Sequence, residues 1–468
     1  MLRLLSLPFA LALLLAPVVS ACGDDDDGAG DDMSDDSSDD TSDDTSDDTS
    51  DDDGGPGACG DIEGTCIELS PVEGSDQEQV QDALIAAQPG DVIFLHAGVY
   101  DIELPLSLDI DGVTIQGEGE AASVLSFATQ VDGPQGLLVT ADDFTAVDFA
   151  VEDTLGDGIK VEGGSRIVFQ GVRTEWTGEV AEENGAYGIY PVQCTDILIE
   201  DSIVRGASDA GIYVGQSERA VVRGNLVENN VAGIEIENTF DADVYDNMAT
   251  ANTGGILVFN LPGLQVPDGG RTRVFDNQII DNNGDNFAPA GNTVALVPKG
   301  TGFVALAAHE VEVFGNTFSG NQTVNVGIIS YFITGNPIDD ETYNPYPDTL
   351  YFHDNVFEGG GDARADLLGL ALTLALNQIG EGAPAETPDV VFDGVINPEL
   401  ADEETGDFLP DFNICLDNNG DADYLDLTFD TFDPKTMLPI YLEPNLDIAP
   451  RECTHEPLPA VVLDGVPL

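Results

Sequence analysis

The sequence predicts an all-β fold in which three-strand coils of about 22 residues stack into a parallel β-helix. A glycine followed by an aliphatic residue recurs along the chain, short alternating apolar and polar runs fill the intervals without a helical pattern, and amides recur at matching positions. Most intervals are 22 or 23 residues, and longer ones indicate coils that carry insertions. The recurring glycines are Gly136, Gly158, Gly188, Gly211, Gly233, Gly255, Gly302 and Gly327.

Three adjacent units display the repeat: GIYPVQCTDILIEDSIVRGASDA, GIYVGQSERAVVRGNLVENNVA and GIEIENTFDADVYDNMATANTG. Each unit holds two short alternating strands, a third weaker one and a polar turn. Stacking of such units places matched amides above one another, where they satisfy hydrogen bonds from coil to coil. The predicted rows are Gln193, Gln216, Asn238 and Asn260; Asn225, Asn247, Asn277, Asn316 and Asn355; and Asn230, Asn252, Asn282 and Asn321.

Both ends of the solenoid carry predicted caps. The segment SDQEQVQDALIAAQPGD places Val80, Ala83, Leu84 and Ala87 at helical spacing, after a Ser75-x-x-Glu78 capping box and before a Pro-Gly stop. A short amphipathic helix there would cover the open edge of the first coil. The apolar run at 365–379 is too short to span a bilayer and is expected to be a buried helix or cap segment.

The N-terminal 58 residues are predicted to lie outside the folded part. MLRLLSLPFALALLLAPVVSAC is an export signal whose Val-Ser-Ala-Cys ending resembles a bacterial lipoprotein signal, which implies that Cys22 becomes the lipidated N-terminus. The alternative is an ordinary cleaved signal. Residues 22–58, rich in Asp, Ser and Thr, cannot form a core and are predicted to be a disordered tether; a calcium sponge is the less favoured interpretation.

Charge and cysteine content narrow the possible functions. The formal net charge is -76, and the tether holds only 17 of the 89 Asp and Glu, so the folded part is itself acidic and should repel nucleic acid. Export permits disulfides, with Cys59/Cys66 and Cys415/Cys453 as the candidate pairs and Cys194 as a buried thiol, although spacing does not prove connectivity.

A family resemblance rests on several motifs together: PGDVIFLHAGVY, GDGIKVEGG, ENGAYGIYPVQC, VAGIEIEN and NICLDNNGDAD. In combination, across roughly residues 75–430, they resemble exported bacterial right-handed parallel β-helix repeat lipoproteins of the pectate-lyase-like, carbohydrate-binding and sugar-hydrolase superfamily. The resemblance implies a right-handed parallel β-helix with N- and C-terminal caps. It implies no activity, because no activity is assigned to the closest group.

A candidate site follows from the alternation of strand side chains. If the isoleucine after each glycine points inward, the next residue points outward. The outward rows are Lys160, Tyr190, Tyr213, Glu235 and Leu257, and Glu162, Val192, Gly215, Glu237 and Phe259. Insertions at 177–187, 284–301, 261–271 and 334–349 flank the same sheet, and we expect them to wall its outer face.

Such a strip suits sugar rings, since aromatic faces stack on C–H faces and carboxylates accept hydroxyl hydrogen bonds. Lys160, Tyr190, Tyr213, Trp176 and Phe259 are the candidate substrate-binding residues. Glu235 and Glu237 are the candidate catalytic pair of a hydrolase, though any alternating Glu-x-Glu strand meets the same spacing test. A lyase or C5-epimerase would need cations or calcium, and the Asp-Pro-His-Asp and Gly-His-Gly signatures of mannuronan epimerases and polygalacturonases are absent.

Two further groups of residues have alternative interpretations. His309 and His353 are candidate general bases, but a single strand histidine is more often structural. Asn419, Asp421, Asp423 and Asp426 have spacings reminiscent of a calcium loop without the glycine of an EF-hand, so a polar turn is favoured. Calcium is the one cofactor with any support.

The sequence therefore predicts four regions: a lipoprotein signal at 1–21, a tether at 22–58, a capped β-helix at 59–360, and final coils with a C-terminal cap at 361–468. We expect a protein of the bacterial cell envelope, held at the outer membrane or cell surface through its N-terminal lipid, that binds a polysaccharide or another extracytoplasmic ligand; whether it also processes a bound polysaccharide stays open. The alternative is a non-catalytic structural or protein-binding lipoprotein.

Overall fold

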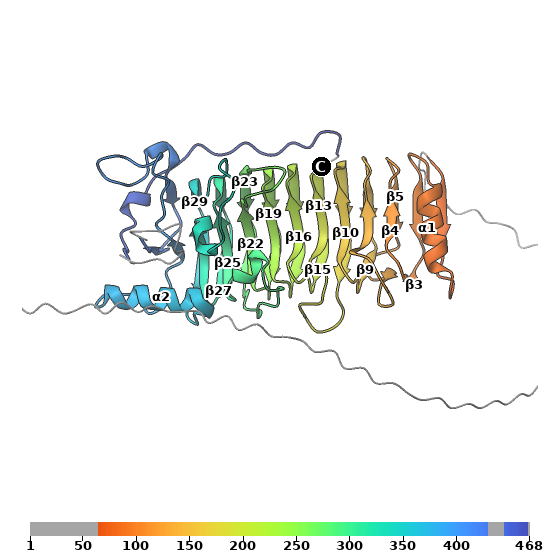
Figure 1. The fold of residues 1–468 in the computed structure, drawn as a ribbon, viewed down its shortest axis with the longest axis horizontal. Helices are drawn as coiled ribbons and strands as arrows, with labels where there is room; N and C mark the ends of the chain where they lie inside the picture. Colours follow the sequence, from red (N-terminus) through yellow and green to blue (C-terminus); the bar gives the residue numbers. More distant parts are fainter. Residues whose placement is uncertain (1–63, 429–443, 467–468) are drawn as a thin grey trace, which may run out of the picture. The chain divides into compact units, whose positions relative to one another are not determined.

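Repeated short strands build three parallel sheets in the computed structural model, which describes residues 64–428 and 444–466. Figure 1 shows the strands stacked along one axis, each coil contributing one strand to each sheet in turn. Every pair of neighbouring strands is parallel. The predicted signal and tether, including Cys22 and Cys59, lie outside the described residues.

Sheet A is the longest, with twelve described strands. In stacking order they are β1 (Cys66–Leu69), β2 (Val92–Leu95), β5 (Thr114–Gly117), β8 (Thr145–Val147), β11 (Ser165–Gln170), β14 (Thr195–Glu200), β17 (Glu218–Arg223), β20 (Phe240–Tyr245), β23 (Gly270–Phe275), β26 (His309–Phe314), β29 (Asp348–His353) and β32 (Ile414–Asp417).

Sheet B contains the weak third strand of each coil. Its described strands are β3 (Gly98–Asp101), β6 (Ser123–Ser126), β9 (Ala150–Glu152), β12 (Arg173–Glu175), β15 (Ile203–Arg205), β18 (Leu226–Glu228), β21 (Met248–Thr250), β24 (Gln278–Ile280), β27 (Thr317–Asn321) and β30 (Val356–Gly360).

Sheet C contains the Gly-Ile strands and carries the candidate site. Its described strands are β4 (Leu106–Leu108), β7 (Gln135–Val139), β10 (Asp157–Glu162), β13 (Tyr187–Val192), β16 (Ala210–Gly215), β19 (Ala232–Glu237), β22 (Gly254–Phe259), β25 (Thr301–Leu306), β28 (Val324–Ile329), β31 (Val390–Phe392) and β33 (Tyr424–Asp426).

The predicted inward isoleucines form the core. Ile159, Ile189, Ile212, Ile234 and Ile256 have no exposed surface and belong to one continuous hydrophobic cluster. The preceding glycine is required by close stacking, since a Cβ on Gly233 would lie 2.5 Å from the carbonyl oxygen of Gly255. The register departs from prediction once: Phe303 pairs with Val326, so Asn325 and not Gly327 aligns with Gly302.

Two of the three predicted amide rows form hydrogen-bonded ladders. In the first, Asn225, Asn247, Asn277, Asn316 and Asn355 each donate to the Oδ1 of the next asparagine, and Asn419 extends the row. In the second, Asn230, Asn252, Asn282 and Asn321 do the same and Asn325 follows. The third row forms no such ladder, because Gln193, Gln216 and Asn238 adopt positive φ and Asn238 binds the loop after β22 instead.

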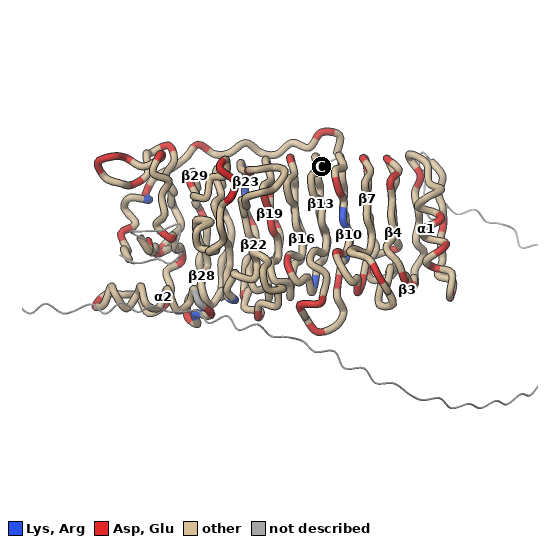
Figure 2. Tube along the Cα trace, viewed as in Figure 1, with Lys and Arg blue, Asp and Glu red and all other residues tan. Residues whose placement is uncertain are grey.

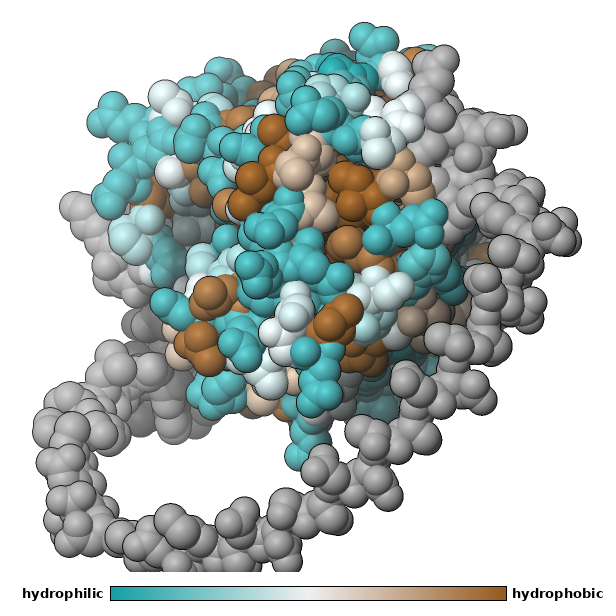
Figure 3. Space-filling view, turned by 90° about the vertical axis from the view of Figure 1, so that its right-hand side faces the viewer, coloured by the Kyte–Doolittle hydropathy of each residue, from teal (hydrophilic) through white to brown (hydrophobic). Residues whose placement is uncertain are grey.

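The N-terminal cap is α1 (Asp76–Ala86), which buries Val80, Ala83 and Leu84 against the first coils, as predicted. The capping box does not form, since Ser75 makes no side-chain cap hydrogen bond. Asp76 instead accepts the backbone N–H groups of Val72 and Asp101, tying the helix to the first coil. Figure 3 looks onto the N-terminal end, where polar surface is interrupted by small apolar patches.

The far end of the core is covered by irregular segments around η3 (Pro410–Phe412) and η4 (Ala449–Arg451), whereas α2 (Asp366–Ile379) packs on the outer face of the last strands of sheet C, against Val391 and Leu425. Leu372, Ala375 and Leu376 of α2 are buried, but Leu370 and Leu374 are about half exposed, so this helix is covered on one face only. None of the described helices is long and apolar enough to cross a membrane.

The cysteines follow the predicted pattern where they are described. Cys415 is bonded to Cys453, which joins β32 to the C-terminal segment. Cys66 is disulfide-bonded, and its predicted partner Cys59 lies outside the described residues. Cys194 is a free, buried thiol, and burial raises its pKa to about 11.

Candidate functional site

The outer face of sheet C carries a tyrosine and carboxyl cluster, which we call the Tyr–acid cluster and define as Asp157, Tyr187, Tyr190, Asp209, Tyr213, Glu235 and Glu237. The predicted outward rows hold: Lys160 pairs with Tyr190, Tyr213 with Glu235, and Gly215 with Glu237. Alternation therefore brings the two glutamates and two of the tyrosines to one face of three neighbouring strands, β13, β16 and β19.

The three tyrosine rings pack against one another. The Tyr187 centroid lies 4.5 Å from those of Tyr190 and Tyr213, and the Tyr190 and Tyr213 centroids are 5.0 Å apart. The Lys160 ammonium lies 5.2 Å from the Tyr190 ring centroid and 3.1 Å from Glu162. Tyr187, Tyr190 and Lys160 remain partly exposed, so this end of the cluster is open to solvent.

Tyr213 links the rings to the acids. Its side chain lies over Gly215, where an added Cβ would come within 2.4 Å of the phenol oxygen. From there the hydroxyl donates to Glu237 Oε1 at 2.5 Å. Only glycine at position 215 leaves room for this contact.

The carboxyls are crowded and shielded from water. Glu235 is 2% exposed and its Oε2 has no hydrogen-bond partner; Glu237 is 7% and Asp209 6% exposed. Burial, together with repulsion from Asp209 and Glu237, holds the pKa of Glu235 well above its usual range. Burial also raises the pKa values of Asp209 and Glu237, although Asn292 and Tyr187 favour the charged form of Asp209 and Tyr213 that of Glu237.

Asp157 extends the acidic environment to the open end. Burial raises its pKa to about 6, against the opposing effects of the Tyr187 backbone N–H and of Lys160. The tyrosines are affected in the same direction, since burial and the nearby acids raise the pKa values of Tyr187, Tyr190 and Tyr213. The cluster therefore holds protons that the same groups would release in water.

The insertion before β25 covers part of this face instead of standing beside it as a wall. Val294 of η1 (Thr293–Leu296) and Val297 pack with Leu257 and Phe259 in a hydrophobic cluster that also contains Tyr213. Asn292 donates to Asp209 Oδ2 at 2.8 Å, which fixes the insertion to a turn 83 residues earlier. The sequence predicted that Glu235 and Phe259 would line the open outer face of sheet C, but the insertion covers them and they are buried.

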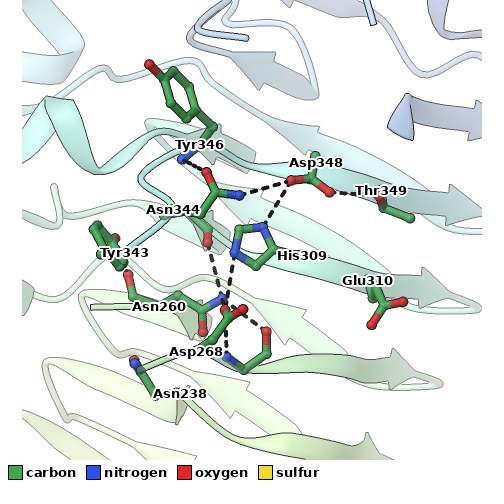
Figure 4. A network of polar contacts seen from close by, with 12 residues as sticks. Asn238, Asn260, Asp268, His309, Glu310, Tyr343, Asn344, Tyr346, Asp348 and Thr349 are labelled. Atoms are coloured by element: carbon green, nitrogen blue, oxygen red, sulfur yellow. Dashed lines mark hydrogen bonds and ion pairs between the residues drawn. The ribbon is translucent and has the colours of Figure 1, made fainter. Parts of the chain in front are cut away.

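Two other insertions pack together at the opposite edge of sheet C. Tyr343 donates to the carbonyl of Asn260 at 2.6 Å, which joins the loop after β28 to the end of β22. His309, at the start of β26, lies between Asp268 at 3.3 Å and Asp348 at 3.2 Å (Figure 4). Burial disfavours its charge, but both carboxylates outweigh this and raise its pKa to about 9. A protonated His309 thus holds the loop after β22, through Asp268, next to the end of the loop after β28, at Asp348. This supports a structural role for His309 over a role as general base.

Several predicted site residues lie elsewhere. Trp176 is buried at the turn after β12, where its indole N–H donates to the Thr154 carbonyl at 2.7 Å; the structure does not bring it onto the strip. Phe259 is 2% exposed beneath the insertion. His353, on sheet A, contacts Glu312 and Asp354 and stacks on Phe314.

The predicted calcium loop is used for other contacts. Asn419 ends the asparagine ladder, Asp423 accepts the backbone N–H of Asp389, and Asp426 accepts Thr428. Among the described residues, no group of three or more His, Cys, Asp or Glu side chains is placed to hold a metal ion. The polar-turn interpretation fits these contacts.

Sequence reasoning missed Asp157, Tyr187, Asp209 and Asn292. The first three lie one or two residues before the repeated glycine. Strict alternation carried back through the glycine places Asp209 outward but Asp157 and Tyr187 inward with the isoleucines, so it identifies only Asp209. The repeat pattern could not identify Asn292, because this residue lies in an irregular insertion.

A cleft of about 770 Å³ lies on another face, at the C-terminal end of sheet A. Two of its acidic groups are already engaged: Glu312 accepts the backbone N–H of Leu458 and contacts His353, and Asp407 binds Arg451. Residues 453–456 and Leu458 form one wall, so the cleft is a gap beside the C-terminal segment. The Tyr–acid cluster remains the better candidate.

Acidic side chains dominate the surface beyond the cluster. In Figure 2 Asp and Glu far outnumber Lys and Arg and gather at turns and insertions. Many of the cations are paired along the stack, for example Arg173 with Glu152 and Glu175, each at 2.6 Å. A ligand of the open face therefore meets unpaired negative charge.

Comparison with known proteins agrees with the fold. A family model described as a right handed beta helix region matches residues 135–295 and 183–343. Together with the three parallel sheets, this identifies a right-handed parallel β-helix. A comparison with curated proteins gave no match.

Solved structures of similar architecture include three enzymes. The A-module of mannuronan C-5 epimerase AlgE4 from Azotobacter vinelandii is 18% identical, with 76% of this chain and 92% of that one covered and a TM-score of 0.49. An alginate lyase from a Paenibacillus species is 17% identical, with 63% of this chain and 98% of that one covered and a TM-score of 0.31. The catalytic unit of the GH87 α-1,3-glucanase from Streptomyces thermodiastaticus is 16% identical, with 64% of this chain and 61% of that one covered and a TM-score of 0.37. At these identities and scores, the activities in the names stay with those proteins.

Proposed function

We propose that this chain, a right-handed parallel β-helix, binds a polysaccharide on the outer face of sheet C, at the open end of the Tyr–acid cluster. The observation that carries the proposal is the packing of three tyrosine rings beside buried carboxyl groups. The partly exposed Tyr187 and Tyr190 offer ring surface for sugar C–H groups, and Lys160 and Asp157 beside them offer a donor and acceptors for hydroxyls.

The charge of the site favours a neutral glycan. Among the described residues, Lys160 is the cation at the cluster's open edge, and it is already paired with Glu162, so a uronate carboxylate finds no free cation there. A carboxylate brought close to Glu162 would also be repelled, because like charges repel. A uronate ligand would need a bridging divalent cation.

Processing of the bound glycan is the finer part of the proposal. A carboxyl that stays protonated near neutral pH is suited to general-acid catalysis, and Glu237 combines a raised pKa with a hydrogen bond from Tyr213. Glu235 beside it is the candidate partner. Both lie beneath the insertion at 281–300, so turnover requires that this insertion move away from the Val294 contact.

That same coverage favours the second candidate function, a non-catalytic lipoprotein that recognises a glycan or a protein partner. In this alternative the buried acids and their layer of apolar contacts only stabilise the face. The two candidates differ in whether bound substrate is converted.

The test is binding of the full chain to a panel of neutral and uronic polysaccharides, with and without calcium, followed by assays for reducing ends and unsaturated uronates. Tyr190→Ala should weaken binding about tenfold, since one stacking ring contributes roughly 1–1.5 kcal/mol. Tyr346→Ala, a half-buried tyrosine in the loop after β28, is the matched control and should bind normally. Absence of binding to every glycan would sink the proposal.

Turnover separates the two candidates. If Glu237→Gln and Glu235→Gln abolish product formation but leave binding intact, the acids are catalytic. Binding without product in the unaltered chain would assign a recognition role.

We also propose that the protein is exported to the bacterial cell envelope and held by lipid at Cys22. The support is the apolar leader ending in Val-Ser-Ala-Cys and the acidic tether that follows it. Metabolic labelling with an alkyne fatty acid should mark the unaltered chain and not Cys22→Ser, while Cys194→Ser, which alters a buried thiol, should still be labelled.

A further inference from the structure

The C-terminal segment 456–466 lies along the outer face of sheet A and crosses its strands. In Figure 1 it runs from the last coils back toward β13. Its backbone donates three hydrogen bonds to the sheet: Leu458 N–H to Glu312 Oε2 at 2.9 Å, Val461 N–H to Asp243 Oδ2 at 3.1 Å, and Asp464 N–H to Asp196 Oδ1 at 2.8 Å. Every third residue of the segment is therefore held.

The spacing of these contacts matches the spacing of the coils. The three acceptors lie on β26, β20 and β14, which are alternate strands of sheet A. Two strand spacings measure about 9.6 Å. A polyproline II helix advances about 9.3 Å in one turn of three residues. The sequence EPLPAVVLDGV, with Pro457 and Pro459, favours that extended conformation.

Each acceptor is held by a side chain of its own sheet, an arginine for two of them and a histidine for the third. Asp196 binds Arg219 at 2.7 Å, Asp243 binds Arg273 at 2.5 Å, and Glu312 contacts His353 at 3.1 Å. The acid side chains are only 5%, 6% and 4% exposed. Because these side chains fix the carboxylates in position, the acceptors are oriented to accept a backbone N–H group.

An apolar stripe completes the surface. Val461, Leu463 and Val466 of the segment are buried against Leu198 and Val221 of sheet A. Val462, between them, is 73% exposed. One side of the extended segment therefore packs against the sheet, and the other side faces solvent.

We propose that the outer face of sheet A is a binding groove for extended, proline-containing peptide segments, and that residues 456–466 of the same chain occupy it in cis. The Cys415–Cys453 disulfide anchors the root of this segment before the first contact at Leu458, so release of the segment leaves the disulfide link intact. The groove lies on a different sheet from the Tyr–acid cluster and does not depend on the function proposed there.

Amide hydrogen exchange on the full chain tests whether every third backbone N–H of the segment is hydrogen-bonded to sheet A. The amides of Leu458, Val461 and Asp464 should exchange about tenfold more slowly than that of Val462, because hydrogen-bonded amides open before they exchange. Deleting Ala460 shifts the register after the first contact and should abolish the protection of Val461 and Asp464. Val462→Ala keeps the register and should preserve it. Uniformly fast exchange in the unaltered chain would overturn the proposal.

Binding in trans tests the groove itself. A labelled synthetic peptide of residues 456–466 should bind saturably to the full chain lacking Ala460, whose own segment is out of register, and about tenfold more weakly to the unaltered chain. A scrambled peptide of the same composition should not bind. Failure of the matching peptide to bind the deletion variant would show that the face is not a peptide groove. Sedimentation should give a monomer, and a dimer that exchanges segments would refute occupation in cis.

Discussion

Glu235 has the most unusual environment of any single carboxyl in the Tyr–acid cluster. It is almost fully buried, one of its oxygens has no partner, and two further acids lie near it. A buried carboxyl in this position avoids the cost of desolvation by keeping its proton. Residues with such perturbed titration often mark functional sites, which is why Glu235 and Glu237 stay in the proposal.

Replacing Glu235 with glutamine should make stability less dependent on pH. A carboxyl whose pKa is higher in the folded than in the unfolded protein lowers stability as pH rises above the unfolded value of about 4.3. Glu235→Gln should therefore have little effect on the free energy of unfolding at pH 4 and should raise it at pH 8. Thermal unfolding across this range measures the difference.

The exposed Glu162→Gln serves as the comparison, because its side chain is 49% exposed and paired only with Lys160. It should leave the pH profile unchanged. A Glu235→Gln variant that is less stable than the unaltered chain at pH 8 would show that Glu235 is charged in the fold.

At the scale of elements, the insertions are held by a few polar contacts and the coils by repeated ones. His309 joins the loops after β22 and β28 through Asp268 and Asp348. The asparagine ladders join consecutive coils through bonds that repeat in register. Loops and coils should therefore respond differently to pH and to substitution.

The His309 contact should weaken in alkaline solution. A histidine whose pKa rises from about 6.5 to about 9 on folding contributes stability that is fully present below pH 6.5 and is lost as pH rises through 9. His309→Gln should cost on the order of 2 kcal/mol at pH 6 and much less at pH 9.5. The exposed neighbouring variant Glu310→Gln should leave this profile unaltered. If His309→Gln lowered the free energy of unfolding equally at both pH values, His309 would not be a charged contact between Asp268 and Asp348.

An asparagine in the middle of a ladder should matter at every pH. Asn247 donates to the Val222 carbonyl and to Asn277, and accepts both the backbone and the side-chain amide of Asn225. Asn247→Ala leaves buried donors and acceptors unpaired, at a cost of about 2–3 kcal/mol. Chemical denaturation measures the loss, and Asn336→Ala, in an exposed loop, should cost under about 0.5 kcal/mol. A small effect of Asn247→Ala would mean that water replaces the ladder.

At the scale of the whole molecule, negative charge is unbalanced. The chain has 13 Lys and Arg against 89 Asp and Glu, so most acids have no cation to pair with. Salt weakens the existing ion pairs, but it also screens the far more numerous repulsions. The repulsions should decide the outcome.

Raising NaCl from about 0.1 M to about 1 M, which shortens the screening length from about 10 to 3 Å, should raise the melting temperature by a few degrees. KCl should act equally if screening is the cause. Calorimetry measures the shift, and a fall in melting temperature would mean that the ion pairs along the stack dominate.

The repeat itself was predictable because its signals are local. Alternation within strands and a period near 22 residues placed Ile234 in the core and Glu235 outward, and stacked Asn247 above Asn277. The single error of register arose because Gly327, which also precedes an isoleucine, lies in β28 two residues beyond Asn325, the residue that aligns with Gly302. The Ser75 capping box failed because Asp76 makes tertiary contacts instead.

The sequence by itself determined the parallel coils, the core isoleucines, two asparagine ladders and the outward row of tyrosines and acids. Only the tertiary structure decided that Glu235 is buried, that Tyr213 reaches Glu237 over Gly215, and that the C-terminal segment lies on sheet A. The physical reason is distance along the chain: Asn292 meets Asp209 across 83 residues and Val461 meets Asp243 across 218. Irregular segments have no period, so their packing partners follow from the folded surface alone.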